Sequence, residues 1–206
     1  MKNSEKIILQ LCADTGSDTK IYRDHGYNVI LVGSEIGVEN YHPPRNVYGI
    51  IANPVCTEFS VVHNGFHRDG DYEKGMFLVR ECQRIISECD PVFWVIENPA
   101  TGRLKNFLGE PRFKYEPWEF GSPWTKRTAL WGKFNIPEKK FKSWSEVPKI
   151  KELPVYQGRQ KPSIAKLHHQ HKRFIREFDS FKVENDMEFR SLCSQKFAQA
   201  FYEKNK

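Results

Sequence analysis

The chain has 206 residues, a length that fits one α/β domain with a small appendage, and 39% of the residues are hydrophobic, which indicates a packed globule. No run approaches the roughly 20 apolar residues that a membrane span needs, and the first apolar run is too short for a secretory signal. The five cysteines are odd in number and form no C-x-x-C pair, which argues against a disulfide framework and a zinc site. We therefore expect a soluble, cytoplasmic protein without a bound metal.

Positive charge is concentrated in one part of the chain. The net charge is +6, but residues 126–176 alone contain 14 Lys and Arg against 3 Asp and Glu, and the remainder is acidic. Such segregation is typical of a face that binds a polyanion, because neutralised phosphates release their counterions. A solubilising surface is the alternative interpretation.

The basic segment also contains a group of histidines, which are His168, His169 and His171. Three cations flank this group, namely Lys166, Lys172 and Arg173. Because these cations would repel a metal ion, we interpret the group as part of a solvated basic face.

Apolar runs followed by turn residues predict strands in the first half of the chain, over residues 6–11, 29–32, 47–52 and 92–96. Helical spacing of apolar residues predicts a helix over residues 80–89. Strands that alternate with helices indicate βαβ units, and hence a mostly parallel sheet with helices on both faces and a ligand site at the carboxyl ends of its strands.

The second half of the chain has a different pattern. Residues 133–162 are rich in Pro, Lys and Trp with weak periodicity, so we predict a small irregular basic insertion, over residues 133–185, within a single domain of residues 1–206. Apolar residues on one helical face predict a helix over residues 186–203.

Cys56 follows the strand predicted at residues 47–52 and a proline, so we expect it at the mouth of the sheet, where a thiolate is both accessible and activated. Buried, inert cysteine is the alternative. Glu97 ends the strand of residues 92–96, where a carboxylate must be paired or protonated. A turn or helix cap, formed with Asn98, is the alternative there.

Lys126 and Arg127 precede a further apolar run, and we expect them near the same sheet edge, able to contact a phosphate or a polarised carbonyl. Ordinary surface charge is the alternative. All three segments are predicted to lie just past the carboxyl end of a strand.

In this order the motifs resemble the cytosine-C5 methyltransferase family, which has a Pro-Pro-Cys loop, then a Glu-Asn dipeptide, then an Arg-x-Arg-like segment. The matching residues are Pro54, Val55 and Cys56 with Ser60, then Glu97 and Asn98, then Lys126, Arg127 and Thr128. Residues 9–19 look like the family's cofactor loop, and residues 189–201 look like its returning segment. The resemblance covers about residues 7–201.

The resemblance implies a class I methyltransferase-like, Rossmann-like fold and a role for each matching residue. Cys56 would add to carbon 6 of cytosine, Glu97 would protonate or hydrogen-bond nitrogen 3, and Arg127 would hold the base carbonyl or its phosphate. The remaining substrate contacts would come from Asn98, Lys126 and Ser60, in a pocket for a flipped-out base that Pro54 also shapes.

The methyl donor implied by the resemblance is S-adenosylmethionine. Its site would be built from Leu11, Asp14, Thr15, Gly16, Glu35 and Pro54, with Glu35 receiving the ribose hydroxyls. The chain departs from the family at Gln10, where an acidic residue is usual, and at Asp14, where glycine is expected. A side chain at residue 14 would crowd the backbone and repel the methionine carboxylate. Val55 replaces a proline, and Ser194, Gln195 and Lys196 replace Pro-Pro-Gly.

Three functions remain open at this point. The first is a working methyltransferase, the second is a cytosine- or nucleic-acid-binding protein with lost or altered cofactor chemistry, and the third is a basic interaction protein on the same fold. Only about 55 residues separate the Arg127 segment from the returning segment, so we expect a short or degenerate DNA target, with RNA or a free nucleotide not excluded. Trp118, Trp124, Trp131 and Trp144 are candidates for base stacking or for core packing. We expect a monomer, and the compactness suits a phage or mobile element.

Overall fold

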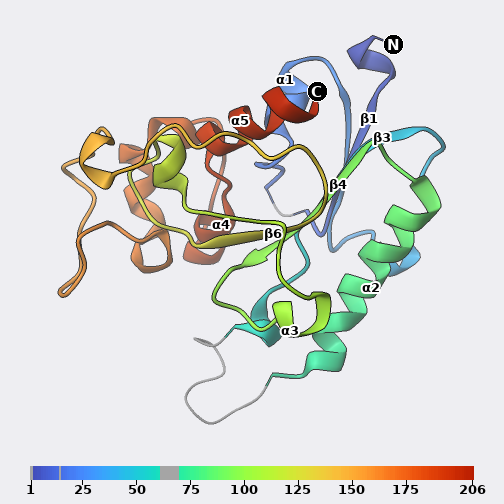
Figure 1. Ribbon diagram of the computed structural model, residues 1–206, viewed down its shortest axis with the longest axis horizontal. Helices are drawn as coiled ribbons and strands as arrows, with labels where there is room; N and C mark the ends of the chain where they lie inside the picture. The colour runs from blue at the N-terminus through green and yellow to red at the C-terminus, as the bar shows by residue number, and fades with distance from the viewer. Residues whose placement is uncertain (1, 14, 61–69) are drawn as a thin grey trace.

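The computed structural model describes residues 2–13, 15–60 and 70–206, which build a six-stranded sheet with helices on both faces (Figure 1). The strands are β1 (Ile7–Leu11), β2 (Asn28–Val32), β3 (Val47–Ala52), β4 (Phe93–Pro99), β5 (Phe113–Tyr115) and β6 (Thr128–Lys133). Their order across the sheet is β2-β1-β3-β4-β6-β5. The first four strands are parallel, whereas β6 is antiparallel to β4 and β5 is antiparallel to β6.

The register aligns the ends of the strands. Leu11 pairs with Ala52, and Ala52 pairs with Ile96, so β1 and β3 end at the same level and β4 continues beyond them to Pro99. We call this side of the sheet the carboxyl edge. The strands are apolar on both sides, as expected for parallel strands that helices cover on both faces.

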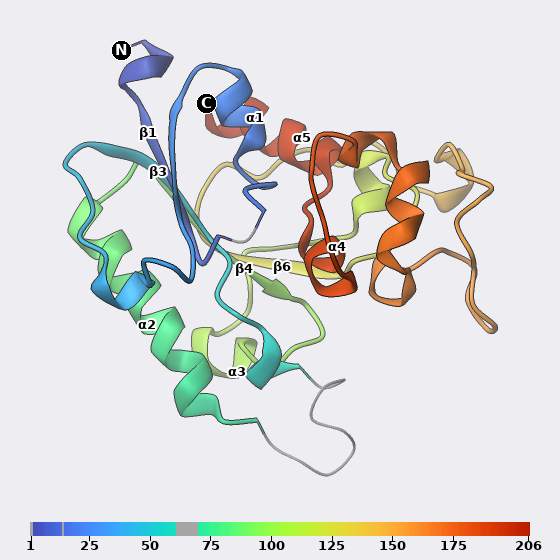
Figure 2. The ribbon, with the colours of Figure 1, turned by 180° about the vertical axis from the view of Figure 1, so that it is seen from behind.

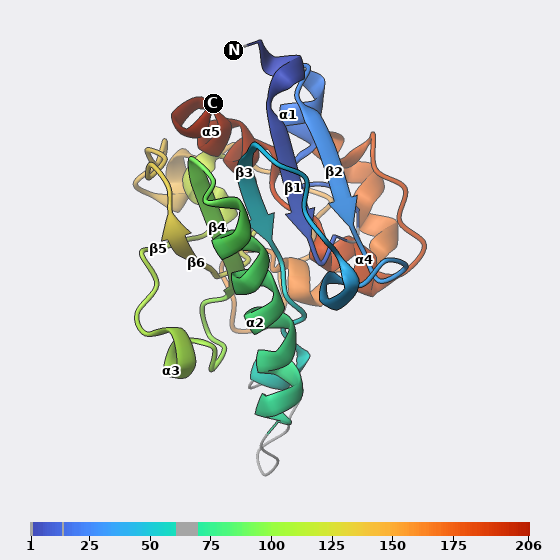
Figure 3. The ribbon, with the colours of Figure 1, turned by 90° about the vertical axis from the view of Figure 1, so that its right-hand side faces the viewer.

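One face of the sheet is covered by α2 (Tyr72–Cys89), seen in front of the strands in Figure 3. Asp71 caps this helix by accepting a hydrogen bond from the Lys74 amide at 3.1 Å. Buried α2 side chains recur at helical spacing (Met76, Val79, Cys82, Ile85 and Ile86) and pack on the sheet.

The opposite face is covered by α1 (Lys20–Asp24) and α5 (Gln195–Asn205), which lie side by side in Figures 1 and 2. Their aromatic residues form a second apolar cluster with Ile51, Phe93 and Val95 of the sheet. The rings of Phe197 and Tyr115 stack with centroids 3.8 Å apart, which joins α5 to β5. Two short helices complete the set, α3 (Lys105–Leu108) and α4 (Asp186–Ser191).

A third apolar cluster surrounds the buried Trp124. Its other members include Leu167 and Phe178 from the irregular segment and Phe189 from α4. Residues 134–185 contain only 3-10 helices in place of strands or α-helices. The 3-10 helices of the described chain are Asn3–Glu5, Val38–Asn40, Thr57–Phe59, Pro117–Phe120, Trp144–Glu146, Ile164–Lys166, His169–Phe174 and Arg176–Phe178.

The predicted α/β fold with a mostly parallel sheet is confirmed. The strand predicted at residues 47–52 matches β3, and the other predicted strands agree with β1, β2 and β4 to within a few residues. The single helix predicted over residues 186–203 is wrong. Leu192 has non-helical backbone angles (φ −52°, ψ 132°), so the chain turns there and forms α4 and α5 separately. Among the described residues, no helix is long and apolar enough to cross a membrane.

Candidate active site

The polar segments singled out from the sequence gather at the carboxyl edge. Cys56 follows β3, and Glu97 lies near the end of β4. The prediction that all three segments follow a carboxyl end is wrong for Lys126 and Arg127, which precede β6. Because β6 is antiparallel and its Thr128 pairs with Pro99 of β4, the two cations nevertheless reach the same edge.

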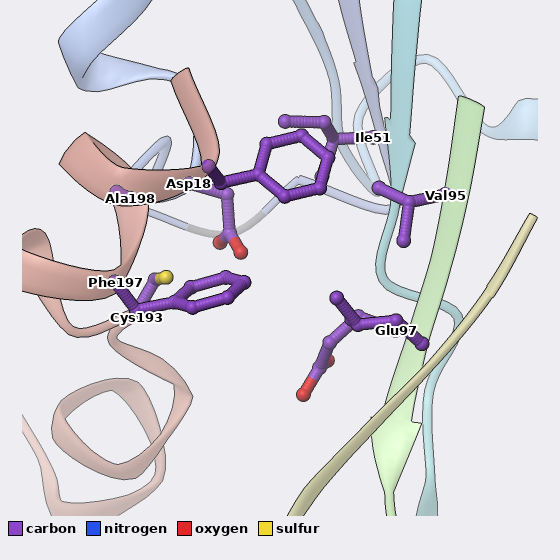
Figure 4. A pocket seen from close by; sticks show the side chains of 9 residues that line it. Asp18, Ile51, Val95, Glu97, Cys193, Phe197 and Ala198 are labelled. Atoms are coloured by element: carbon purple, nitrogen blue, oxygen red, sulfur yellow. The ribbon is translucent and has the colours of Figure 1, made fainter. Parts of the chain in front are cut away.

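Glu97 points toward the face that α5 covers, as Val95 does. Its carboxyl lines a small cavity together with Asp18 and Cys193 (Figure 4). The cavity measures about 20 Å³, which is room for one water molecule. Burial raises the pKa of the Glu97 carboxyl, and the ammonium of Lys126 offsets only part of this rise. Glu97 therefore retains its proton to a higher pH than an exposed glutamate does.

Asp18 lines this cavity and Asn53 lies beside it, and sequence reasoning missed both. The Asn53 amide nitrogen lies 3.5 Å from a carboxylate oxygen of Asp18 and 3.4 Å from one of Glu97, so it bridges the two acids. Burial also raises the pKa of Asp18, which the Lys126 ammonium again offsets in part. Gln10 donates to Asn53 at 3.3 Å, and this polar residue inside an apolar strand was the one available sequence signal.

The loop that carries Cys56 is fixed to the end of β4. The Asn98 amide donates to the carbonyl of Pro54 at 2.9 Å, and the Asn98 side chain is buried. The Cys56 carbonyl accepts from the amide of Phe59 at 3.0 Å and so begins a 3-10 turn. Phe59 is fully buried, and its carbonyl accepts from the Arg103 amide at 2.9 Å. The Cys56 side chain is half-buried, as an accessible thiol must be.

Asn98 retains one unused hydrogen-bonding atom. Its side-chain oxygen is buried and has no partner among the described residues. A buried polar atom of this kind is available to a ligand or a water. Two further residues of this loop reach the solvent. Val55, next to Cys56, is 54% exposed, and Ser60 is half-buried.

Lys126 and Arg127 have different surroundings. The Lys126 ammonium donates to the carbonyls of Ser191 and Leu192 at 3.0 and 3.3 Å, and its charge acts on Glu97. The Arg127 side chain is exposed and pairs with Glu116 at 3.1 Å. Lys126 is thus the cation on the Glu97 side of β6.

The residues expected to hold a cofactor lie at the ends of β1, β2 and β3 or in the turns that follow them. Leu11, Gly16 and Pro54 are buried, Thr15 is half-buried and Glu35 is exposed, whereas Asp14 lies outside the described residues. The turns that follow β1 and β2 touch, since the Ala13 amide donates to the Val32 carbonyl at 3.0 Å. A β-carbon on Gly33 would lie 2.8 Å from the Ala13 carbonyl oxygen, so this close approach requires glycine.

The chemistry of these residues fits a nucleoside-bearing donor. Within the described structure, no hydrogen bond or ion pair engages the Glu35 carboxylate, which leaves it available to ribose hydroxyls. Ile36, directly after it, is 49% exposed and offers an apolar surface to a base.

The four tryptophans that the sequence analysis named as stacking candidates divide into two pairs. Trp124 and Trp131 are buried and belong to the core. Trp118 and Trp144 are half-buried and meet edge-to-face at 6.5 Å. The ammonium of Lys161 lies 4.0 Å from the centre of the Trp118 ring, so this pair forms an aromatic and cationic patch.

The histidines of the basic segment lie beside Asp186, a neighbour that the sequence alone did not indicate. Ligand atoms of His168, His169 and Asp186 lie within 4.8 Å of one another. His169 Nδ1 is 2.8 Å from one Asp186 oxygen, and the Arg190 guanidinium is 3.2 Å from the other. These contacts hold the 3-10 segment against α4.

No family model matches the chain. Over 43% of its length the chain is 33% identical to a protein of Frog virus 3 (isolate Goorha) that is named a probable DNA (cytosine-5)-methyltransferase, and the match covers 47% of that protein. The chain thus spans less than half of this curated relative. The match confirms the resemblance to cytosine-C5 methyltransferases that the motifs indicated.

Among solved structures, the chain is similar to a prophage-encoded protein from E. coli that is described as a DNA modification methyltransferase. The sequence identity is 18%, the TM-score is 0.40, and the match covers 64% of this chain and 49% of the other. A similarity at this level adds nothing to the topology described above.

Proposed function

We propose that this chain transfers a methyl group from S-adenosylmethionine to carbon 5 of cytosine in DNA, through a covalent adduct at Cys56. The observation that carries the proposal is a desolvated carboxyl, Glu97, at the same sheet edge as the Cys56 loop. Asn98, the neighbour of Glu97, holds that loop through the Pro54 carbonyl. The similarity to the viral relative supports the same chemistry.

The reaction needs two groups with opposite tasks. Carbon 5 of cytosine is a weak nucleophile, so the Cys56 thiolate adds to carbon 6, forming a carbon–sulfur bond and moving ring electrons toward carbon 5. Glu97 delivers a proton or a hydrogen bond to nitrogen 3, which takes up the displaced charge. When bound, the donor supplies an electrophilic methyl group. Carbon 5 then gives up its proton to a water molecule, Glu97 takes back the proton on nitrogen 3, and the Cys56 sulfur leaves as a thiolate, which restores the ring.

The residues around the reacting pair would orient the base and the donor. The free Asn98 oxygen is suited to the exocyclic amine of a flipped-out base. Lys126 and Arg127 would hold the base carbonyl and a phosphate, and Glu35 would hold the ribose of the donor. A short or degenerate cytosine target suits the small basic segment.

A second candidate is a cytosine-binding protein with altered cofactor chemistry. The observation that favours it is a set of polar side chains, Gln10, Asp18 and Asn53, which hydrogen-bond to one another beside the Glu97 carboxyl. The cavity that Glu97 lines measures only about 20 Å³. The two candidates differ in one measurable respect, namely binding of the methyl donor.

DNA that contains 5-fluorocytosine tests the proposal directly, because fluorine at carbon 5 cannot leave as a proton does and the adduct is trapped. Wild-type protein with S-adenosylmethionine should form a denaturation-resistant complex, and Cys56→Ala should form none. Cys89→Ala is the matched control, since burial raises the pKa of that half-buried thiol to about 11 and leaves it unreactive.

Mass spectrometry should locate the adduct at Cys56. An adduct that persists in Cys56→Ala, or one that Cys89→Ala abolishes, would refute the assignment of the nucleophile. Calorimetry with S-adenosylmethionine decides between the two candidates. If the protein binds DNA but not S-adenosylmethionine, methyl transfer is refuted and the cytosine-binding protein with altered cofactor chemistry takes its place.

A further inference from the structure

A second and larger cavity lies at the end of the sheet opposite the carboxyl edge. It measures about 340 Å³ and is bounded by the start of β4, the end of β6 and the end of α5. The chain passes from Lys126 to Lys133 between the two sites, and at about 3.3 Å per strand residue this separates them by roughly 20 Å. Methyl transfer at Cys56 therefore makes no use of this cavity.

Four cationic side chains line the cavity, and they are Arg112, Lys133, Lys204 and Lys206. No acidic side chain of the described residues lines it. Glu138 pairs with Lys204 and Glu203 pairs with Lys206, each at 2.6 Å. In the described chain, the side chains of Arg112 and Lys133 make no ion pair, so the cavity retains an excess of positive charge.

The wall of the cavity is held in a fixed shape by Asn205, which is buried. Its side-chain oxygen accepts from the Asn135 amide at 2.8 Å, and its amide donates to the carbonyls of Asn135 and Phe201 at 3.0 and 2.9 Å. Asn135 in turn donates from its side chain to the Lys204 carbonyl at 2.9 Å. These bonds join the end of β6 to the last turn of α5, and so place the cations at a defined separation.

Arg112 is positioned by an aromatic ring. Its guanidinium carbon lies 5.7 Å from the centre of the Phe134 ring, a cation–π contact that leaves the N–H groups free for an anion. An arginine fork beside several ammonium groups matches the geometry and charge of phosphate, and the volume lies within the range of small-molecule sites.

We propose that this cavity is a phosphate-binding site, separate from the methyl-transfer site, in which Arg112 and Lys133 make the principal contacts. The phosphate belongs either to a small phosphorylated ligand or to the backbone of DNA that extends past the carboxyl edge. The same side chains recognise both, and the experiment below distinguishes them.

Titration with inorganic phosphate and with pyrophosphate at low salt tests the site, with calorimetry as the readout. Wild-type protein should bind both anions saturably, and pyrophosphate more tightly. The double variant Arg112→Ala with Lys133→Ala should bind at least about tenfold more weakly, which corresponds to about 1.4 kcal/mol. Arg45→Ala with Lys74→Ala removes the same charge from exposed positions outside the cavity and should leave binding unchanged.

Thermal unfolding of both double variants should match that of the wild type, because Arg112 and Lys133 are exposed. Arg112→Lys with Lys133→Arg should restore most of the affinity if charge in a fixed frame is what binds. Absence of saturable binding, or equal weakening in the two double variants, would overturn the proposal.

Competition with DNA identifies the source of the phosphate. A duplex of about 30 base pairs with its target cytosine at the centre extends ~50 Å to either side at ~3.4 Å per pair and so reaches both sites, whereas one of about 8 base pairs extends only ~14 Å and stops short of the cavity. Competition by the longer duplex alone assigns the site to DNA backbone, and competition by neither assigns it to a small ligand. Phosphate binding should be unaffected in Cys56→Ala, so the two proposals fail independently.

Discussion

The carboxyl of Glu97 is held in a desolvated cavity, and that placement makes the stability of the protein depend on pH. Because its pKa is raised in the folded state, this group contributes most stability below its unfolded value of 4.5, and the contribution is lost as pH rises through the folded pKa. Glu97→Gln should therefore raise the free energy of unfolding at pH 8, by about 1.4 kcal/mol per unit of pKa rise. The gain should vanish near pH 4.5. Methyl transfer should fall by about 100-fold or more.

Glu152→Gln is a suitable control, since it changes an exposed carboxyl away from the cavity and should alter neither property. Asp18 contributes to the raised pKa of Glu97 through its charge. Asp18→Asn should thus shift the alkaline limb of the pH profile of activity to lower pH while the catalytic groups remain. An unchanged limb would show that Asp18 acts only in packing.

At the scale of secondary-structure elements, Lys126 joins β6 to the turn between α4 and α5. Its two hydrogen bonds to the carbonyls of Ser191 and Leu192 are charge-assisted, and such bonds contribute about 1.5–3 kcal/mol. Lys126→Met, which retains the apolar stem, should lower the free energy of unfolding by an amount in this range. Hydrogen exchange of the amides between Ser191 and Ser194 should accelerate, because the turn loses its anchor.

Lys133→Met at the other end of β6 is the matched control, since that ammonium contacts no carbonyl in the described structure. Lys126→Met should also raise the pKa of Glu97 further, because it removes the charge that lowers it. If the amides of this turn exchange hydrogen at the same rate in the wild type and in Lys126→Met, Lys126 does not anchor the turn.

At the scale of the whole molecule, the basic segment lies beside the sheet and carries the charge that we expect to hold DNA. Lys166, Lys172 and Arg173 lie on its 3-10 turns. The logarithm of the affinity for duplex DNA should fall linearly with the logarithm of salt concentration, by about 0.9 per neutralised phosphate. Replacing the three cations with Ala should make the slope shallower by about 0.9 for each phosphate contact that is lost.

A triple variant of Lys74, Arg80 and Lys105 to Ala removes the same charge from exposed positions elsewhere and should leave the slope nearly unchanged. Fluorescence anisotropy at several salt concentrations measures both slopes. If the two triple variants reduce the slope equally, net charge and not the basic segment determines DNA binding.

The sequence by itself determined the four parallel strands, β1 to β4, and the order of the chemical groups along the chain. β3 was predicted at its observed bounds because a strand covered on both faces must be continuously apolar, and that pattern is local. Cys56 and Glu97 were predicted at strand ends for the same reason. The cavity itself was not predictable, since Asp18, Glu97 and Cys193 come from three distant segments and carry no shared local pattern.

Only the tertiary structure decided the direction of β6 and the break between α4 and α5. An apolar strand has the same pattern in either direction, so the side from which Lys126 approaches follows from pairing with β4. The periodicity of residues 186–203 is continuous, but the Ser194 side chain caps α5 by accepting from the Phe197 amide, and Lys126 binds the turn before it. Contacts between segments outweigh local helix preference there, because they supply partners for the backbone groups that the end of α4 and the start of α5 leave without intrahelical bonds.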